Sequence, residues 1–588
     1  MRFRSLAIAV LSCCAAPAFA ATTIDKVVVR GIDDETMVAN IQAALSLHES
    51  VGKRLGETRF EYLLDQAQAE AAGALEPFGY YSPTISVDAP RATATADGQA
   101  DAHVTVTVHV TLGEPVRVRN RDIHIDGEGG DDSYLQQDLA DFTPRVGDVF
   151  DHTTYEASKL KIAQRLADRG YLDADFTVRK VEITRAAHAA DIDLGWVSGI
   201  RYDMGPTTFH QDYFNPGLLD RLVYWQRGSY YHQGKLDQLR ESLVGLDYFG
   251  SIDIQPDVDA AVGGEVPIDV NLALAKRDVY TYGVSYGTES GPGVRAGVER
   301  RYVNKRGHKL SVQLDYAAKR KELDTLYKIP AFKWLDGWYG IGSKLYDEQT
   351  DYIDTRRIDL YVGRSGQISD RLTANVTLHA LHERWSYGTD GFDNASLLYP
   401  EIDAQYVDVD DKLFPRRGFT AHATLRGGLQ ALASDANFAQ AQMTVWAYRG
   451  VGEADRFLFR GEAGTTLTGD LYSMPPSLRF FAGGDLSVRG YAYREVGPRL
   501  ANGYALGGQS VLTGSAEFEH YFNAGPYGIA VFVDSGSAFN DNSPSFQTGA
   551  GLGFRYRSPI GPIRVDLAHG FDDPDQKVQL YLSIGVTL

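Results

Sequence analysis

Two segments of the sequence have residue types and a spacing that could bind a metal or a cofactor. His379–Glu383 places two histidines and a glutamate close together, as in some zinc sites. The surrounding residues alternate between polar and apolar, which predicts a strand, and side chains three positions apart on a strand point to opposite faces. Residues 549–553 have the Gly-x-Gly-x-Gly spacing of a phosphate-binding loop, but no helix is predicted after them. We therefore expect no metal site and no dinucleotide site at these segments.

Asp408–Asp411 forms an acidic turn. At the cell surface such a turn could bind a divalent cation, and a solvated loop is the interpretation that we favour. The first half of the chain has no nucleophile elbow, Walker loop, metal-binding histidine cluster or redox cysteine pair. No residues elsewhere support an enzymatic function, so we expect neither an enzyme nor a cofactor.

The net charge speaks against nucleic acid as a partner, and the N-terminal segment indicates export. The 58 Lys and Arg against 77 Asp and Glu give a net charge of −19, whereas nucleic-acid binding requires a basic footprint. Outside the N-terminus no apolar run approaches the ~18–20 residues of a spanning helix. Cys13 and Cys14, the only cysteines, lie in Met1–Ala20, which reads as a secretory signal peptide ending in Ala18–Ala20. A lipoprotein signal around Leu11–Cys14 fits less well.

From about Val279 onward the sequence alternates between polar and apolar residues. In Leu372–Ala380 the even positions are apolar and the odd positions polar, and Lys309–Tyr316 and Val578–Leu588 alternate in the same way. This period of two predicts strands with one face in water and the other in an apolar medium. A sandwich with one wet side and a soluble barrel also alternate, but neither explains so many strands without helices to cover them.

We therefore predict that residues 276–588 form an antiparallel transmembrane β-barrel. The sheet must close, because lipid offers the backbone no hydrogen-bond partners. At about 20 residues for each strand and its connection, this length predicts roughly 16 strands. Most of the 60 glycines and 34 tyrosines of the chain fall in this half, as expected for barrel turns and membrane-interface aromatics.

The first half contains three segments with one shared pattern: a strand, two amphipathic helices, a turn with glycine and tyrosine, and two further strands. The turn is Gly79-Tyr80 in the first segment and Gly170-Tyr171 in the second, whereas the third has Tyr248 without a preceding glycine. Glycine lets a helix end in the left-handed conformation, and the aromatic ring then covers the junction. We predict three α/β domains that act as binding modules, at residues 22–112, 113–198 and 199–275.

Four segments of the second half resemble motifs of the BamA/TamA outer-membrane assembly superfamily. Arg479–Tyr491 resembles the sixth-loop motif, and Phe532–Gly536 resembles an aspartate-bearing barrel strand. Gly549–Asp566 is similar to the signature before the last strand, and Tyr280–Gly307 to the opening hairpin of TamA barrels. The three segments in front resemble POTRA domains. A count of three favours the TamA branch, since BamA proteins usually have five and two-partner secretion transporters two.

The same resemblance implies a site inside the barrel. Alternation places Asp534 and Glu517 on the lumen face of their strands. In the family the sixth loop folds into the barrel and its arginine meets such carboxylates, which implies charge-assisted hydrogen bonds for Arg489. Glycine after this arginine permits a close turn, beside which the tyrosine packs. We expect this site to lock the loop and not to catalyse a reaction; its motif comprises Val488, Arg489, Gly490 and Tyr491.

The resemblance further implies a weak seam between the first and last barrel strands, here about Tyr280–Thr288 and Gln579–Leu588. Glycines weaken strand pairing, and the seam contains Gly283, Gly287 and Gly585. Free backbone donors and acceptors at this seam would be a template for another strand.

Taken as a whole, the resemblance predicts an outer-membrane protein with its POTRA domains in the periplasm. It would insert or help secrete β-barrel proteins, such as autotransporters, at the seam. The implied partners are a TamB-like inner-membrane-anchored protein that contacts the first POTRA domain, nascent outer-membrane β-barrel proteins and membrane lipids. Lipid transport between the membranes fits the same architecture. A two-partner secretion pore would instead predict two POTRA domains, and a diffusion porin would need none.

Overall fold

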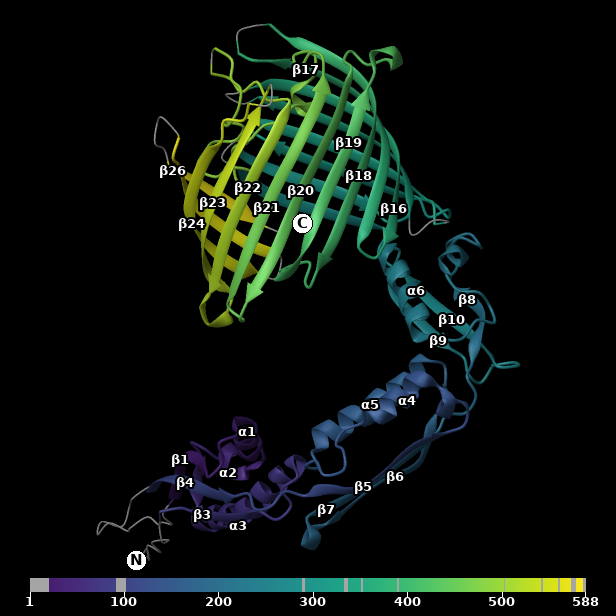
Figure 1. Ribbon diagram of the computed structural model, residues 1–588, viewed down its shortest axis with the longest axis vertical. Helices are drawn as coiled ribbons and strands as arrows, with labels where there is room; N and C mark the ends of the chain where they lie inside the picture. Colours follow the sequence, from purple (N-terminus) through teal and green to yellow (C-terminus); the bar gives the residue numbers. More distant parts are fainter. Residues whose placement is uncertain are drawn as a thin grey trace, which may run out of the picture. The chain divides into compact units, whose positions relative to one another are not determined.

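The computed structural model (Figure 1) describes residues 21–90, 102–287, 291–332, 337–349, 353–388, 391–501, 503–540, 543–558, 561–572 and 578–584. The predicted signal peptide Met1–Ala20, and Gly585 and Leu588 of the predicted seam, lie outside these residues. No helix within these ranges is long and apolar enough to cross a membrane.

The chain forms two compact units. The first comprises Met1–Pro206, Trp225–Leu236 and Pro256–Ile268. The second comprises Thr207–Tyr224, Asp237–Gln255 and Asp269–Leu588. Residues of the predicted third domain therefore contribute to both units.

The first module carries a mixed sheet covered by helices. Its elements are β1 (Ala21–Arg30), α1 (Glu35–Ala44), α2 (Ser46–Glu49), β2 (Arg54–Gly56), α3 (Glu57–Leu75), β3 (Thr84–Asp88) and β4 (Ala102–Thr111). The sheet order is β2-β1-β4-β3, with β1 parallel to β4 and the other pairs antiparallel. Apolar residues of α3, spaced as on one helix face, pack on the sheet and include Leu63, Ala67 and Leu75.

The second and third modules repeat this plan in a shorter form. The second consists of β5 (Arg117–Asp126), α4 (Ser133–Ala140), α5 (His152–Asp168), β6 (Asp175–Thr184) and β7 (Ala189–Val197), in the sheet order β5-β7-β6. The third consists of β8 (Asp203–His210), α6 (Gln233–Gly245), β9 (Phe249–Pro256) and β10 (Glu265–Leu274), in the order β8-β10-β9. Where the shared pattern predicts a first helix, the third module has only the 3-10 turn Leu219–Leu222. Pro216 and Gly217, both poor helix formers, precede that turn.

The predicted glycine turns end the helical segments as expected. Gly79 and Gly170 have φ of +87° and +93°, so both lie in the left-handed region. Asp247 takes this position in the third module, with φ of +53°. The first two turns also accept a backbone hydrogen bond from the chain that enters the next domain. Val116 N donates to Gly79 O at 2.8 Å, and Tyr202 N donates to Gly170 O at 2.9 Å.

Within the described ranges, sixteen strands follow in one antiparallel sheet in which each strand pairs with the next (Figure 1). They are β11 (Asp278–Gly287), β12 (Gly291–Arg300), β13 (Lys309–Ala317), β14 (Arg320–Pro330), β15 (Trp338–Gln349), β16 (Asp354–Ser369), β17 (Leu372–Ser386), β18 (Asp393–Val409), β19 (Arg417–Gly428), β20 (Phe438–Val451), β21 (Asp455–Thr468), β22 (Ser510–Tyr521), β23 (Tyr527–Phe539), β24 (Gln547–Ser558), β25 (Gly561–Gly570) and β26 (Val578–Ile584). The predicted strand number agrees with this sheet.

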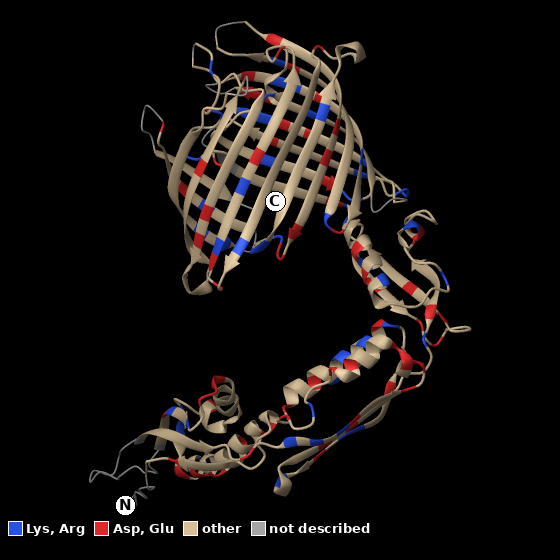
Figure 2. Ribbon diagram, in the orientation of Figure 1, with Lys and Arg blue, Asp and Glu red and all other residues tan. Residues whose placement is uncertain are grey.

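Alternation places two kinds of side chain on the two faces of the barrel wall. In β23, Val531 and Val533 are about half exposed on the outer face, whereas Phe532 and Asp534 are buried on the lumen face. Figure 2 shows acidic and basic residues interleaved along the strands. An apolar outer face over a polar lumen is the pattern of a barrel in lipid.

Gly170→Ala is expected to destabilise the turn after α5. A left-handed backbone costs about 1–2 kcal/mol for a residue with a Cβ atom, and the added methyl group would lie 2.8 Å from Cβ of Tyr231. Gly147 has the same φ of +93° but nothing within 4 Å, so Gly147→Ala measures the backbone cost alone. Hydrogen–deuterium exchange at the last turn of α5 should be faster in Gly170→Ala; equal exchange in both variants would contradict the steric contribution.

Candidate functional site in the barrel lumen

The site is built on residues 469–509, which connect β21 to β22 and are called the long loop below. Its tip turns back on itself, since Gly484 N donates to Tyr491 O and Ser487 N to Gly484 O, both at 3.2 Å. Val488 at the tip is fully buried in an apolar cluster with Phe480, Val496 and Val511, among others. The cluster holds the tip against lumen-facing side chains of the wall.

Arg489 lies at the centre of three carboxylates. Its Nε and Nη2 donate to the two oxygens of Asp534 at 2.7 and 3.0 Å, in a bidentate arrangement. Nη1 donates to Glu517 at 2.7 Å and to Asp566 at 3.0 Å. The guanidinium carbon is also 3.4 Å from the ring centroid of Phe532, a cation–π contact that adds to the charge pairing.

A second arginine pairs with two of these acids and with a fourth one. Arg555 is fully buried and pairs with Glu517 at 2.7 Å, with Glu519 at 2.8 Å and with Asp566. Glu519 also accepts from Arg456 at 2.6 Å. Buried charges are tolerated only when they are paired and hydrogen-bonded, and this network meets that condition. We call it the lumen cluster: Arg456, Arg489, Arg555, Glu517, Glu519, Asp534 and Asp566.

The two residues after Arg489 contact the last strands of the sheet. Gly490 N donates to the Tyr581 hydroxyl at 3.0 Å, and that hydroxyl donates to Tyr491 O at 2.7 Å. The Tyr491 hydroxyl donates to Thr548 O at 3.1 Å. Gly490 has φ of +104°, and a Cβ atom there would meet the backbone of Gly570 at 2.6 Å. Only glycine fits this close approach.

The structure thus brings the predicted loop motif together with Asp534 and Glu517. The predicted seam residues Tyr280, Gly283 and Gly287 lie in β11, and Gly585 and Leu588 lie outside the described residues. Sequence reasoning did not identify Arg456, Arg555, Glu519, Asp566 or Tyr581 as members of the site. Alternation could have found Asp566, because its neighbours Val565 and Leu567 are apolar.

Residues 379–383 and 549–553, whose spacing resembles metal and dinucleotide sites, both lie in barrel strands. His379 Nδ1 lies 3.0 Å from Asp359 on the lumen side, whereas His382 bonds Ser396 on the other face, so the predicted opposite orientation is confirmed. Across the described ranges, no group of three or more His, Cys, Asp or Glu could hold a metal ion. Residues 549–553 lie in β24 and are followed by strand.

Comparisons with known proteins agree with this architecture. Residues 303–588 match the model of the Omp85 superfamily domain. Residues 26–111 match the model of TamA POTRA domain 1, and residues 118–194 match a POTRA model described as a surface antigen variable number repeat. These matches cover the barrel from β13 onward and most of the first two modules.

Curated relatives and a solved structure point the same way. The outer membrane protein assembly factor BamA of Nitratidesulfovibrio vulgaris is 24% identical over 378 residues, which cover 58% of this chain and 45% of that protein. Outer envelope protein 39 of Arabidopsis thaliana chloroplasts is 31% identical over 134 residues, 21% of this chain and 33% of that protein. The matched regions therefore span less than half of either relative. The crystal structure of BamA from Haemophilus ducreyi lacking POTRA domains 1–3 has a TM-score of 0.65, covering 79% of this chain and 98% of that chain at 17% identity.

The chain therefore belongs to the Omp85 superfamily, as an outer-membrane β-barrel protein with POTRA domains ahead of the barrel. The predicted family and fold class are confirmed. The family is not an enzymatic one, which agrees with the expectation from the sequence.

Arg489→Ala should leave a barrel that inserts but is less stable. The substitution leaves three buried carboxylates short of a partner, and breaking a buried ion pair costs about 3–5 kcal/mol. On gels run after heating, the folded band of the variant should convert to the unfolded band at a lower temperature than the folded band of the unsubstituted protein. Arg499→Ala is the matched control, because Arg499 is an exposed arginine of the same loop that bonds backbone oxygens of Glu495 and Gly503. Equal melting of the two variants would refute the role of the lumen cluster.

Proposed function

We propose that the protein assembles other outer-membrane proteins: it helps insert or secrete β-barrel proteins such as autotransporters, whose strands pair at the seam between β11 and β26. The two sheet edges at the seam carry this proposal. Among the described residues, β11 pairs only with β12 and β26 only with β25. Unpaired backbone groups at an edge form a template for an added strand.

Side-chain exposure supports the presence of these edges. Tyr282 and Val284 on the outer face of β11 are 78% and 90% exposed, and Leu582 of β26 is 60% exposed. Val531 and Val533, on the outer face of the interior strand β23, are only 47% and 46% exposed. Interior strands also have exposed apolar side chains, such as Leu552 of β24 at 67%, so it is the exposure of Tyr282 and Val284 that supports an edge at β11, which has one neighbouring strand among the described residues.

The lumen cluster contributes to this function by holding the closing strand. Tyr581 belongs to β26 and bonds both Gly490 and Tyr491 of the long loop. Arg489, the preceding residue, is fixed by the carboxylates of Asp534 and Glu517. We infer that the loop locks the last strand in place while the edge of that strand stays available to a client.

The family likeness also supports a location and a set of partners. The modules would lie in the periplasm, where nascent outer-membrane β-barrel proteins arrive, and membrane lipids would surround the outer face of the barrel. The match to TamA POTRA domain 1 supports a TamB-like inner-membrane-anchored partner at the first module. The Asp408–Asp411 turn follows β18, the eighth strand of the sheet, and the turn at 301–308 follows β12, the second strand. Both turns lie at the end of the barrel where the chain enters from the modules. With the modules in the periplasm, the Asp408–Asp411 turn therefore faces the periplasm and not the cell surface.

Locking the seam tests the proposed mechanism. A cysteine at Tyr280 or Val284 of β11, combined with one at Leu580 or Leu582 of β26, should form a disulfide across the seam. Client insertion into liposomes should then stop and return when the disulfide is reduced, because client strands need the free edges. The control pair is Val565→Cys with Leu582→Cys, which are partners in the β25–β26 ladder and lock no edge. Full insertion activity with the seam crosslinked would rule out the mechanism.

A photo-crosslinking amino acid at Tyr62 tests the proposed partner. Tyr62 on α3 of the first module is 52% exposed, and Tyr134 on α4 of the second module is 55% exposed, so the two sites are matched in residue type and accessibility. We expect a crosslink from Tyr62, but not from Tyr134, to a long β-rich protein anchored in the inner membrane. A crosslink to a dedicated secreted protein would instead favour an export pore, and a crosslink to lipid alone would favour lipid transport.

A further inference from the structure

The long loop is also held at its root, near β21, by residues that have no part in the lumen cluster. Met474 and Leu478 are buried in an apolar cluster with Leu381, Tyr399 and Phe438, among others. These wall residues come from β17, β18 and β20, whereas the acids that hold Arg489 come from β22, β23 and β25. The root and the tip of the loop therefore rest on different parts of the barrel wall.

One side-chain amide links the loop root to the wall by a direct hydrogen bond. Gln440 on β20 is buried, and its Nε2 donates to Leu478 O at 2.7 Å and to Thr466 Oγ1 at 2.6 Å. Its Oε1 accepts from Nε of Arg426 at 2.6 Å. Because a guanidinium group can only donate, Arg426 fixes the orientation of the amide and directs its NH2 group at the loop.

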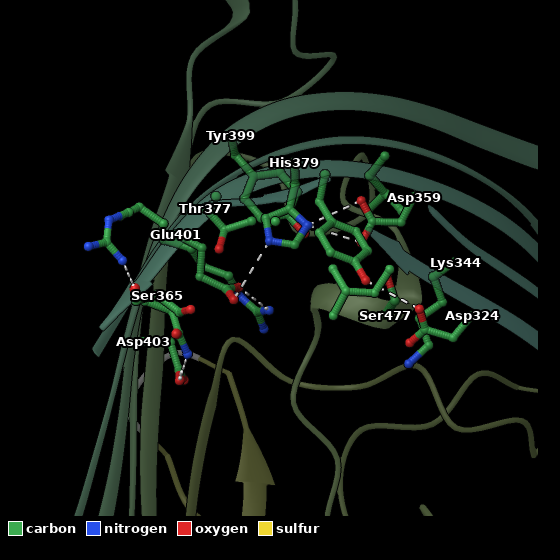
Figure 3. Close-up of a pocket in the computed structure, with 18 of the residues that line it drawn as sticks. Asp324, Lys344, Asp359, Ser365, Thr377, His379, Tyr399, Glu401, Asp403 and Ser477 are labelled. Carbon is green, nitrogen blue, oxygen red and sulfur yellow. Dashed lines mark hydrogen bonds and ion pairs between the residues drawn. The ribbon is translucent and has the colours of Figure 1, made fainter. Parts of the chain in front are cut away.

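A further set of lumen residues holds Arg426 in place. Its Nη1 lies 3.4 Å from Glu401, which in turn lies 3.8 Å from Nε2 of His379. The His379 ring bonds Asp359 and stacks on Tyr399, with ring centroids 5.0 Å apart and planes 8° apart (Figure 3). Since Tyr399 and Leu478 belong to the same apolar cluster, the polar chain and the apolar contacts meet at the loop root.

The loop root borders an open chamber. A cavity of about 560 Å³ lies between strands β14–β19 and the loop residues Ser477 and Leu478 (Figure 3). Ser477 Oγ and His379 Nε2 are buried and have no hydrogen-bond partner among the described residues. On this side the root has space to move into. Contacts from β17–β20 therefore help to fix its position, beside the hydrogen bonds of the neighbouring Arg479 to Met474 O and to the Tyr387 hydroxyl.

We propose that Gln440, oriented by Arg426 and Glu401, is a positioning residue that anchors the root of the long loop separately from the anchor of its tip at Arg489. This inference concerns the position of the loop and goes beyond the proposed assembly function. Loss of the Gln440 amide leaves Leu478 O without its side-chain donor, and the root then moves toward the chamber.

Cysteine labelling of the loop root measures this movement in the full-length protein in detergent micelles. The reporter is Ser477→Cys, and the sequence contains no cysteine other than Cys13 and Cys14. Adding Gln440→Leu should raise the rate of maleimide labelling about tenfold, as expected from the loss of buried hydrogen bonds. Gln442→Leu is the matched control, since Gln442 lies two residues away on the same face of β20 but bonds Glu462 and not the loop; its effect should be under about twofold.

A second reporter at the tip separates release of the root from general loss of stability. Ser487→Cys should label at the same rate with and without Gln440→Leu, because the tip keeps its own anchor. Equal acceleration at both reporters, or no acceleration at Ser477→Cys, would overturn the proposal. If Gln440→Leu yields no heat-modifiable barrel, the isosteric Glu401→Gln replaces it, and an unchanged rate at Ser477→Cys in that variant overturns the proposal as well.

Discussion

Pairing of buried charge in the lumen is the constraint on which the closing half of the barrel depends. An unpaired guanidinium away from water costs several kcal/mol, so Arg489 can be buried only where Asp534, Glu517 and Asp566 converge. These acids come from three strands, and a slip of one residue in any of the ladders would turn a carboxylate toward lipid. The loop position and the register of β22–β25 are therefore fixed by the same interactions.

This constraint divides the sheet into a part that is held and a part that is free. The last strand is tied to the loop by the Tyr581 hydroxyl, while the opening strand carries no such contact among the described residues. The edge side chains Tyr282 and Val284 are correspondingly exposed. On the proposed function, the fixed last strand would act as the template, because a template has to keep its own register while the added strand finds its pairing.

The length of the segment was sufficient to predict the approximate strand number, and the period-two pattern was sufficient to predict the barrel and the inward orientation of Asp534 and Glu517. It could not predict which charges meet, because that depends on the stagger between strands rather than on the pattern within one strand. Arg555 illustrates the limit: its segment alternates, yet its contact with Glu519 joins residues 36 positions apart. Loops have no period at all, so the contact of Gln440 with the long loop could not be predicted from the sequence.

The third module departs from the repeated turn at the residues that contact the barrel. At the position of the glycine in the first two modules it has Asp247, which forms an ion pair with Arg301 of the barrel at 2.6 Å, a contact that glycine could not make. Tyr248, fully buried, donates its hydroxyl proton to Gly307 O in the turn after β12. In the first two modules the same turn accepts a hydrogen bond from the chain that enters the next module. The repeated turn therefore forms the joint to the following domain in every case, and its residue types change where that domain is the barrel.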